Sequence, residues 1–148
     1  MFSGEDAIRD WFKTNETNFL EGLQPSERAD FLEFEGNAQG FRILTRLQQR
    51  QNDGGLQLTY AVLGAFSKYP RASAIFGMDR KKVSEKKFGF FQSETGYFEK
   101  VAQGLGLKKK KDAAWCRHPL AFLTEAADDI CYLIIDFERL SHSFFVLK

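Results

Sequence analysis

The feature that most constrains this chain is a periodic stretch at residues 117–140. Placed on a helix at about 100° per residue, its apolar side chains gather on one side and its acidic side chains on the other. Pro119 fits the first turn of such a helix, because the N–H group that proline lacks would have no partner there. The sequence therefore predicts a long helix whose apolar stripe faces the core and whose acidic stripe faces a cleft or solvent.

The rest of the chain also carries helical patterns, and few strands are visible. Residues 52–55 form a predicted turn, and residues 71–96 are interpreted as a long loop that can include a short extended piece. The predicted fold class is therefore all-α. The expected shorter helices run from the Ser3 cap through Phe12, from Pro25 to the break at Gly36, through Phe41 and Leu47, from Leu58 to Tyr69, and from Tyr97 to Leu105.

Length and composition limit what the chain can be. Its 148 residues suffice for one domain with a core, and its net charge of +1 demands neither a nucleic acid nor an acidic partner. Its 16 phenylalanines indicate much aromatic surface, buried in the chain or against something else. No signal-peptide pattern is present, and no apolar run reaches the roughly 18 residues of a membrane span. We therefore expect no membrane segment. Because Cys116 and Cys131 are isolated and lack metal spacing, we expect a reduced, cytoplasmic protein.

Three side chains of the acidic stripe, Asp128, Tyr132 and Asp136, are spaced four residues apart and so stack on one helix face. A carboxylate is a hard oxygen ligand for a divalent metal ion. A tyrosine can stack on a sugar or base, and a second carboxylate can accept hydrogen bonds from sugar hydroxyls. A solvated acidic face has the same pattern, and periodicity alone favours it. Stacked like charges cost stability, which slightly favours a functional role.

This predicted helix carries three motifs in one order: Arg117-His118-Pro119-Leu120, Glu125-Ala126-Ala127-Asp128-Asp129-Ile130-Cys131-Tyr132 and Asp136-Phe137-Glu138. Together they resemble the bacterial dGTP triphosphohydrolases of the HD superfamily. The resemblance implies that Asp128 is the last metal ligand of the HD site and that Tyr132 and Asp136 contact the nucleotide. It also implies a multi-helical HD-domain fold.

Further motifs match the same family in the same order upstream, so the resemblance extends over nearly the whole chain, to about Glu138. The glutamate of the first motif, Glu5, is implied to work with a nearby histidine in acid–base chemistry. Arg42, in the second, is counted among the substrate-binding candidates because it can reach a phosphate; it can equally pair with an acid such as Glu35. The matching segments are Ser3–Ile8, Phe34–Arg42, Leu58–Pro70 and Gly96–Phe98.

An HD site needs histidines and aspartates that converge on a metal ion. This chain has 2 histidines, His118 and His142, and neither stands in a His-Asp pair. The position three residues before Glu5, where the family has a histidine, holds Phe2. The resemblance therefore implies that residues 1–148 are a partial HD-type dNTP triphosphohydrolase domain, without the upstream HD motif and the C-terminal half. The divalent ion of the complete enzyme, Mg²⁺ or Mn²⁺, is not expected to be held by this chain alone.

Other patterns admit more than one interpretation. The lysine run at 108–111 favours a solvated loop over a phosphate or nucleic-acid contact. Basic residues interleaved with phenylalanines at 80–91 can track single-stranded DNA, which we treat as the minority interpretation. Asn37 is expected to cap a helix, and His118 to pack or cap rather than catalyse.

Two functions from different classes follow. The first is a hydrolase that converts dGTP and water into deoxyguanosine and triphosphate, present here as a fragment inactive by itself. The second is a non-catalytic module that binds a nucleotide or single-stranded DNA. The family match favours the first for the origin of the gene, and the missing histidines favour the second for the chain as it stands. The expected partners are dGTP or another dNTP and, under the second function, single-stranded DNA. Further copies of the chain are also expected, since the family forms oligomers and the phenylalanine-rich composition leaves apolar surface to cover.

Overall fold

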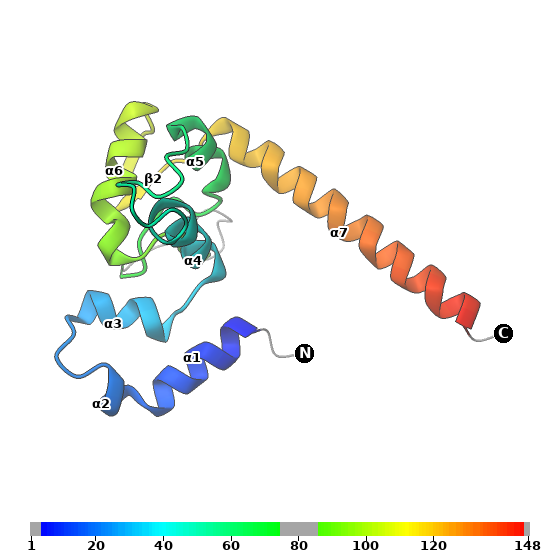
Figure 1. Ribbon diagram of the computed structural model, residues 1–148, viewed down its shortest axis with the longest axis horizontal. Coiled ribbons are helices and arrows are strands. Elements are labelled where there is room, and N and C mark those ends of the chain that lie inside the picture. Colours follow the sequence, from blue (N-terminus) through cyan, green and yellow to red (C-terminus); the bar gives the residue numbers. More distant parts are fainter. Residues whose placement is uncertain (1–3, 75–85, 147–148) are drawn as a thin grey trace.

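The computed structural model describes residues 4–74 and 86–146, with side chains as far as Ser141. Figure 1 shows short helices gathered in a body and one long helix, α7, that leaves it. The expected Ser3 cap, the substitution at Phe2 and the basic residues 80–82 lie outside the described residues.

The N-terminal part is built from α1 (Gly4–Thr14), the short α2 (Glu16–Phe19) and α3 (Pro25–Leu32). Helices α1 and α3 pack against each other, and the rings of Phe12 and Phe31 lie 4.9 Å apart. The predicted start of α3 is confirmed: Pro25 is its first residue, and the Gln24 amide donates a hydrogen bond to the Glu27 carboxylate at 2.9 Å. That bond satisfies one of the two donors that a capping box serves at a helix start.

Helix α4 (Gly36–Arg42) continues into a π-helical turn, η1 (Ile43–Leu47). The residue before α4, Glu35, has extended backbone angles and stands in the N-cap position. Asn37 therefore lies inside the helix, and the expectation that it caps a helix is wrong. The helix begins at Gly36, two residues earlier than an N-cap at Asn37 would place its start.

The core forms where α4 meets α5 (Tyr60–Phe66), the 3₁₀ turn η3 (Gln92–Glu94) and α6 (Thr95–Gly104). Aromatic rings fill it: Phe90 and Phe98 stack with ring centroids 4.4 Å apart, and the Trp115 ring lies tilted, 5.4 Å from that of Phe98. Much of the aromatic surface that the composition predicts is therefore buried within the chain. The main cluster of buried residues is Phe41, Leu63, Ala72, Phe90, Phe98, Val101, Ala102 and Trp115.

A small antiparallel sheet pairs β1 (Lys109–Lys111) with β2 (Ala114–Trp115). The chain is mostly helical, as predicted, but the all-α class omitted this sheet. Every side chain of β1 is exposed, so the lysines are solvated as expected, whereas the expected loop is a strand. The strand forms because its backbone pairs with β2, whose Trp115 is buried in the core. The lysine run by itself gives no sign of that pairing.

The predicted long helix is confirmed as α7 (Pro119–Val146). It packs on α5 at its base, and Figure 1 shows the remainder leaving the body. Residues 126–140 are exposed on every side, and Phe137 is 74% exposed. The expectation that its apolar stripe faces the core is therefore wrong for this chain, because no other described segment covers it. Among the described helices, none is both long enough and apolar enough to cross a membrane.

Candidate functional site

Glu5 lies in the first turn of α1, where it joins two other parts of the chain. Its Oε1 accepts a hydrogen bond from the Gly36 amide at 2.9 Å, at the start of α4. Its Oε2 lies 2.9 Å from the ammonium nitrogen of Lys87. The carboxylate is thus held in place from two directions and is not free to rotate.

Lys87 connects Glu5 to a second carboxylate. The Lys87 ammonium lies 2.9 Å from Glu35 Oε2, and Arg9 Nη2 lies 2.9 Å from Glu35 Oε1. Arg9 also approaches Glu5 at 3.4 Å. We call these four residues, Glu5, Arg9, Glu35 and Lys87, the Glu5 cluster. Acids and bases alternate in it, so each charge has opposite charges as its nearest neighbours.

The surroundings of the Glu5 cluster shift its proton equilibria in opposite directions. Burial alone would raise the pKa of Glu5, but hydrogen bonds from Lys87 and Gly36 outweigh it and hold the pKa below its ordinary value. Burial raises the pKa of Glu35, which the Lys87 hydrogen bond only partly offsets. The two carboxylates raise the pKa of Lys87, despite its burial. Glu5 is therefore an ionised acceptor at neutral pH, and Lys87 a firmly protonated cation.

A hollow of about 320 Å³ opens beside the Glu5 cluster. Its basic residues outnumber its acidic ones, which suits an anionic group. The Arg71 guanidinium is tied to the backbone there, donating to the carbonyls of Lys87 and Ala72. The lining residues are Arg9, Glu33, Glu35, Arg71, Ser73, Lys86, Lys87 and Phe88.

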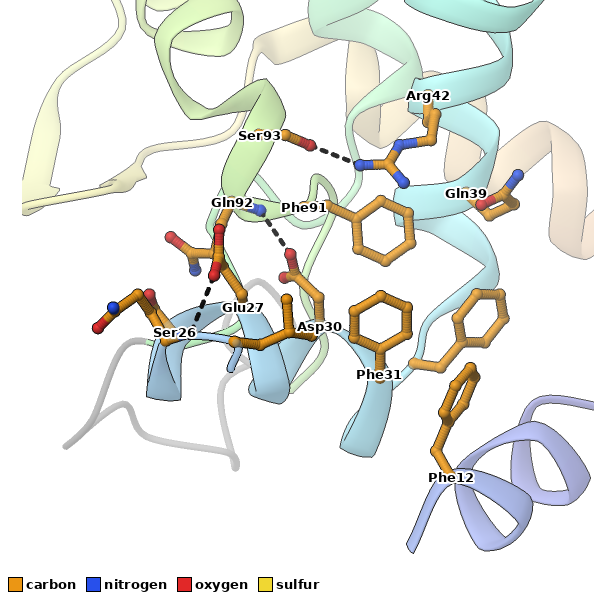
Figure 2. Close-up of a pocket in the computed structure, with 13 residues that line it drawn as sticks. Phe12, Ser26, Glu27, Asp30, Phe31, Gln39, Arg42, Phe91, Gln92 and Ser93 are labelled. Carbon is orange, nitrogen blue, oxygen red and sulfur yellow. Dashed lines mark hydrogen bonds between the residues drawn. The ribbon is translucent and has the colours of Figure 1, made fainter. Parts of the chain in front are cut away.

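Arg42 stands at the end of α4, in a different place from Glu5. Its guanidinium donates to Glu94 at 3.2–3.3 Å and to Ser93 Oγ, and lies 4.5 Å from the centre of the Phe91 ring. Of the two alternatives for Arg42, the structure therefore shows the pairing with an acid, although that acid is Glu94 and not Glu35. Arg42 lines a second cavity, which Figure 2 shows.

The three candidates on α7 are not gathered into a pocket. Asp128, Tyr132 and Asp136 are all exposed, and Tyr132 is 62% exposed. Figure 1 shows this helix lying apart from α1, which carries Glu5. The expected concavity shared by these side chains is therefore not found among the described residues, because residues 126–140 of α7 are exposed and no described segment lies against their acidic side. The metal-binding role expected of Asp128 and the nucleotide contacts expected of Tyr132 and Asp136 gain no support from the geometry of this chain alone.

The residues described do not fit a divalent ion by themselves. Asp128 is not joined by other ligands, and no three His, Cys, Asp or Glu side chains converge on a common point within residues 4–74 and 86–141. His118 accepts a hydrogen bond from the Leu120 amide at 3.2 Å and so caps the start of α7, as predicted. The side chain of His142 lies outside the described residues.

The base of α7 is fixed by ion pairs around Glu125. One oxygen of Glu125 lies 2.9 Å from the Lys68 ammonium, and the other lies 2.7 Å from Arg117 Nη2. Arg117 Nε also donates to the Lys68 carbonyl at 2.8 Å. The hydrogen bond from Lys68 is the largest cause that holds the pKa of Glu125 below its ordinary value. These contacts set the direction in which α7 leaves the body.

The phenylalanines of the basic stretch 80–91 do not offer rings to a nucleic acid. Phe88, Phe90 and Phe91 are 2%, 0% and 4% exposed and belong to the core. Base stacking on a single strand requires exposed rings, so this interpretation of the aromatic residues is wrong. Of its basic residues, Lys86 and Lys87 line the hollow beside the Glu5 cluster, and residues 80–82 lie outside the described residues.

Comparison with known proteins finds relatives that share a name. The chain is 50% identical, over 137 residues and 92% of its length, to a deoxyguanosinetriphosphate triphosphohydrolase-like protein of Pseudomonas aeruginosa. It is 51% identical over 146 residues to one of Synechocystis. It is 32% identical over 162 residues to a deoxyguanosinetriphosphate triphosphohydrolase of Enterobacter. The chain spans about a third of the length of these relatives, 30%, 33% and 30% respectively. No family model matches it.

The similarity supports a relation to proteins named for dGTP hydrolysis and is consistent with a fragment of that family. It covers most of this chain and only part of each relative. Sequence reasoning identified Glu5 but missed Arg9, Glu35 and Lys87, which the fold brings to it. Lys87 is 82 positions from Glu5, and no local pattern marks that pairing.

Proposed function

We propose that this chain forms the substrate side of a dGTP triphosphohydrolase, which hydrolyses dGTP to deoxyguanosine and triphosphate. The observation that carries the proposal is the 50% identity over 92% of the chain with a protein named deoxyguanosinetriphosphate triphosphohydrolase-like. Identity at this level, with the Glu5 segment and the Asp128 segment in one order, supports shared chemistry better than any single motif does.

The Glu5 cluster supplies a fixed arrangement of charge to this proposal. Its hollow, with Lys87, Arg9 and Arg71 in the wall, suits an anion such as a phosphate chain. Glu5 is ionised and immobilised by two hydrogen bonds, so it can orient a donor beside such a group. On α7, Asp128 is proposed as a metal ligand, and Tyr132 and Asp136 as nucleotide contacts.

A bound Mg²⁺ or Mn²⁺ would stabilise charge on a phosphate and activate water. Asp128 alone does not provide such a site, so its other ligands have to come from protein that is not among the described residues. The exposed side of α7 likewise needs a cover, which we propose is further protein of the same kind. We therefore propose that the isolated chain is inactive and that the active form is a larger homo-oligomeric assembly.

A chimera tests the proposal. The matched residues of the Pseudomonas aeruginosa relative would be replaced by those of this chain, and triphosphate release from dGTP measured with Mg²⁺ or Mn²⁺ by anion-exchange chromatography. We expect release at a rate comparable to that of the unaltered relative, lost in Asp128→Ala and kept in Glu138→Ala, a matched acid on the same helix. A folded chimera without release, beside an active relative, contradicts the proposal.

A second candidate is a non-catalytic module that binds a nucleotide. The observation that favours it is a basic hollow in a chain whose described residues hold no group of metal ligands. The chimera experiment distinguishes this candidate from the hydrolase. If the folded chimera binds dGTP but releases no triphosphate, the binding module is the better conclusion.

A further inference from the structure

A cavity larger than the hollow beside the Glu5 cluster lies between α1, α3, α4 and the start of η3 (Figure 2). Its volume is about 570 Å³. Cavities that bind small ligands measure about 300–1,000 Å³, so this one can enclose a ring system with substituents. It shares no lining residue with the hollow beside the Glu5 cluster, so it is a separate place in the fold.

Phenylalanine rings make up its apolar wall. Phe12 comes from α1, Phe31 and Phe34 from α3 and the turn after it, and Phe91 from the segment before η3. Figure 2 shows the rings of Phe31 and Phe91 beside the same space as the Asp30 carboxylate. The ring centroids of Phe12 and Phe31 lie 4.9 Å apart, and those of Phe34 and Phe91 lie 6.1 Å apart. Rings arranged in this way can contact a planar ligand with their faces and their edges.

A buried carboxylate faces this aromatic wall. Asp30 is 8% exposed, and its oxygens accept hydrogen bonds from Ser73 Oγ and from the Gln92 amide, the latter at 2.8 Å. Each carboxylate oxygen can accept two hydrogen bonds, so both retain capacity. Burial raises the pKa of Asp30 to about 6, which leaves it largely ionised at neutral pH. A ligand with N–H groups could therefore donate hydrogen bonds to the Asp30 carboxylate.

The charges around the cavity disfavour an anion. Among the residues that line the cavity, Arg42 carries the positive charge, and it is already paired with the buried Glu94, which is 2% exposed. Asp30 and Glu27 add two carboxylates to the same lining. A phosphate placed here would meet more negative than positive charge, unlike one in the hollow beside Lys87.

We propose that this cavity binds an uncharged planar heteroaromatic ring with N–H donors on its edge, the chemistry of a purine base or nucleoside. The ring lies against Phe31 and Phe91, and its edge donates to Asp30. The side-chain amides of Gln39 and Gln92, which line the same cavity, can both donate and accept. The proposal does not rest on the proposed function, because it concerns a different cavity and excludes the triphosphate.

Calorimetric titration of the full chain tests this inference with three probes. Deoxyguanosine carries the ring and the donors, dGTP adds the charged triphosphate, and naphthalene is planar without donors. We expect one saturable site for deoxyguanosine and affinities lower by about tenfold or more for the other two probes. Phe31→Ala weakens deoxyguanosine binding by about tenfold, and Phe122→Ala, an exposed ring on α7, leaves it unchanged.

A second variant keeps the test independent of any loss of folding. Ser26→Trp places a bulky ring in the cavity and leaves Asp30 and the phenylalanines of its wall unchanged. We expect it to abolish deoxyguanosine binding while the circular dichroism spectrum is unchanged. Absence of saturable binding overturns the proposal. So does binding that survives both Phe31→Ala and Ser26→Trp, or naphthalene binding as tightly as deoxyguanosine. Equal affinity for dGTP, lost in Ser26→Trp, overturns the exclusion of anions. None of these results bears on the chimera.

Discussion

Glu5 and Lys87 are 82 positions apart in the sequence, yet the carboxylate Oε2 of one lies 2.9 Å from the ammonium nitrogen of the other. Lys87 simultaneously holds Glu35 at 2.9 Å. One cation therefore balances two acids that come from α1 and from the residue before α4. Through this ion the start of α1 is tied to the start of α4, and both are tied to the segment that leads into the core phenylalanines.

Removing that cation should destabilise the fold. In Lys87→Met the two carboxylates lose their common partner, and we expect the free energy of unfolding to fall by about 1–2 kcal/mol at neutral pH. The value is small because Lys87 and Glu5 are only partly buried. Urea denaturation followed by circular dichroism measures the change. Lys86→Met, a neighbouring exposed lysine, is the control and should change stability by less than about 0.5 kcal/mol.

The same variant should alter the response to acid. The pKa of Glu5 is held below its ordinary value, so its contribution to stability is present above that ordinary value and lost as the pH falls through the lowered one. Lys87→Met removes the largest cause of the lowering. The difference in stability between wild type and variant should therefore shrink on acidification from pH 7 towards the folded pKa. A difference independent of pH would mean that the pair contributes by packing alone.

The sequence was sufficient for elements whose cause is local. Pro119 and the helical period that follows it predict α7, and Pro25 with Glu27 predicts the start of α3. The strand β1 was not predictable from its lysines, because its backbone partner next to Trp115 determines it. Helix periodicity likewise identifies the apolar side of α7 but does not say what covers it.

In the candidate site, too, the sequence was sufficient for what is local and not for contacts between distant residues. Glu5 was identifiable by resemblance, whereas its pairing with Lys87 depends on long-range folding. So does the pairing of Arg9 and Lys87 with Glu35. The interpretation of the phenylalanines at 88–91 as a stacking surface failed because basic neighbours suggest a surface while burial depends on the whole core. Pairing of charges across the fold is the kind of information that a single sequence does not carry.

The isolated chain should release no triphosphate from dGTP, with or without added Mg²⁺ or Mn²⁺. Asp128 is exposed on α7 without neighbouring ligands among the described residues, and a single carboxylate binds a divalent ion weakly. The measurement is anion-exchange chromatography after long incubation at high protein concentration. Metal-dependent turnover that disappears in Asp128→Ala would show that the chain assembles a working site by itself.

The fold should become less stable as the pH rises, because the buried Asp30 carboxyl group becomes ionised. Burial raises its pKa from 3.8 to about 6, so its favourable contribution is complete below the lower value and is lost as the pH rises through the upper one. Ser73, Gln92, Arg42 and Glu94 face the carboxyl group, and of these Glu94 adds to the rise. Relative to Asp30→Asn, which does not titrate, wild type should lose about 2–3 kcal/mol between pH 4 and pH 7. Parallel pH profiles in urea denaturation would refute this.

The chain should self-associate through the apolar side of α7. Leu133 is 70% exposed and Phe137 is 74% exposed, and both lie on the stripe that has no cover among the described residues. Burying each would contribute about 1.5–3 kcal/mol, so Leu133→Glu with Phe137→Glu should weaken association by about a hundredfold or more. Sedimentation equilibrium over a range of concentrations measures it. Ile135→Glu introduces the same charge on the opposite side of the helix and should leave association unchanged. If wild type sediments as a monomer at high concentration, or if Ile135→Glu dissociates it as well as the double variant does, the apolar stripe of α7 is not the interface.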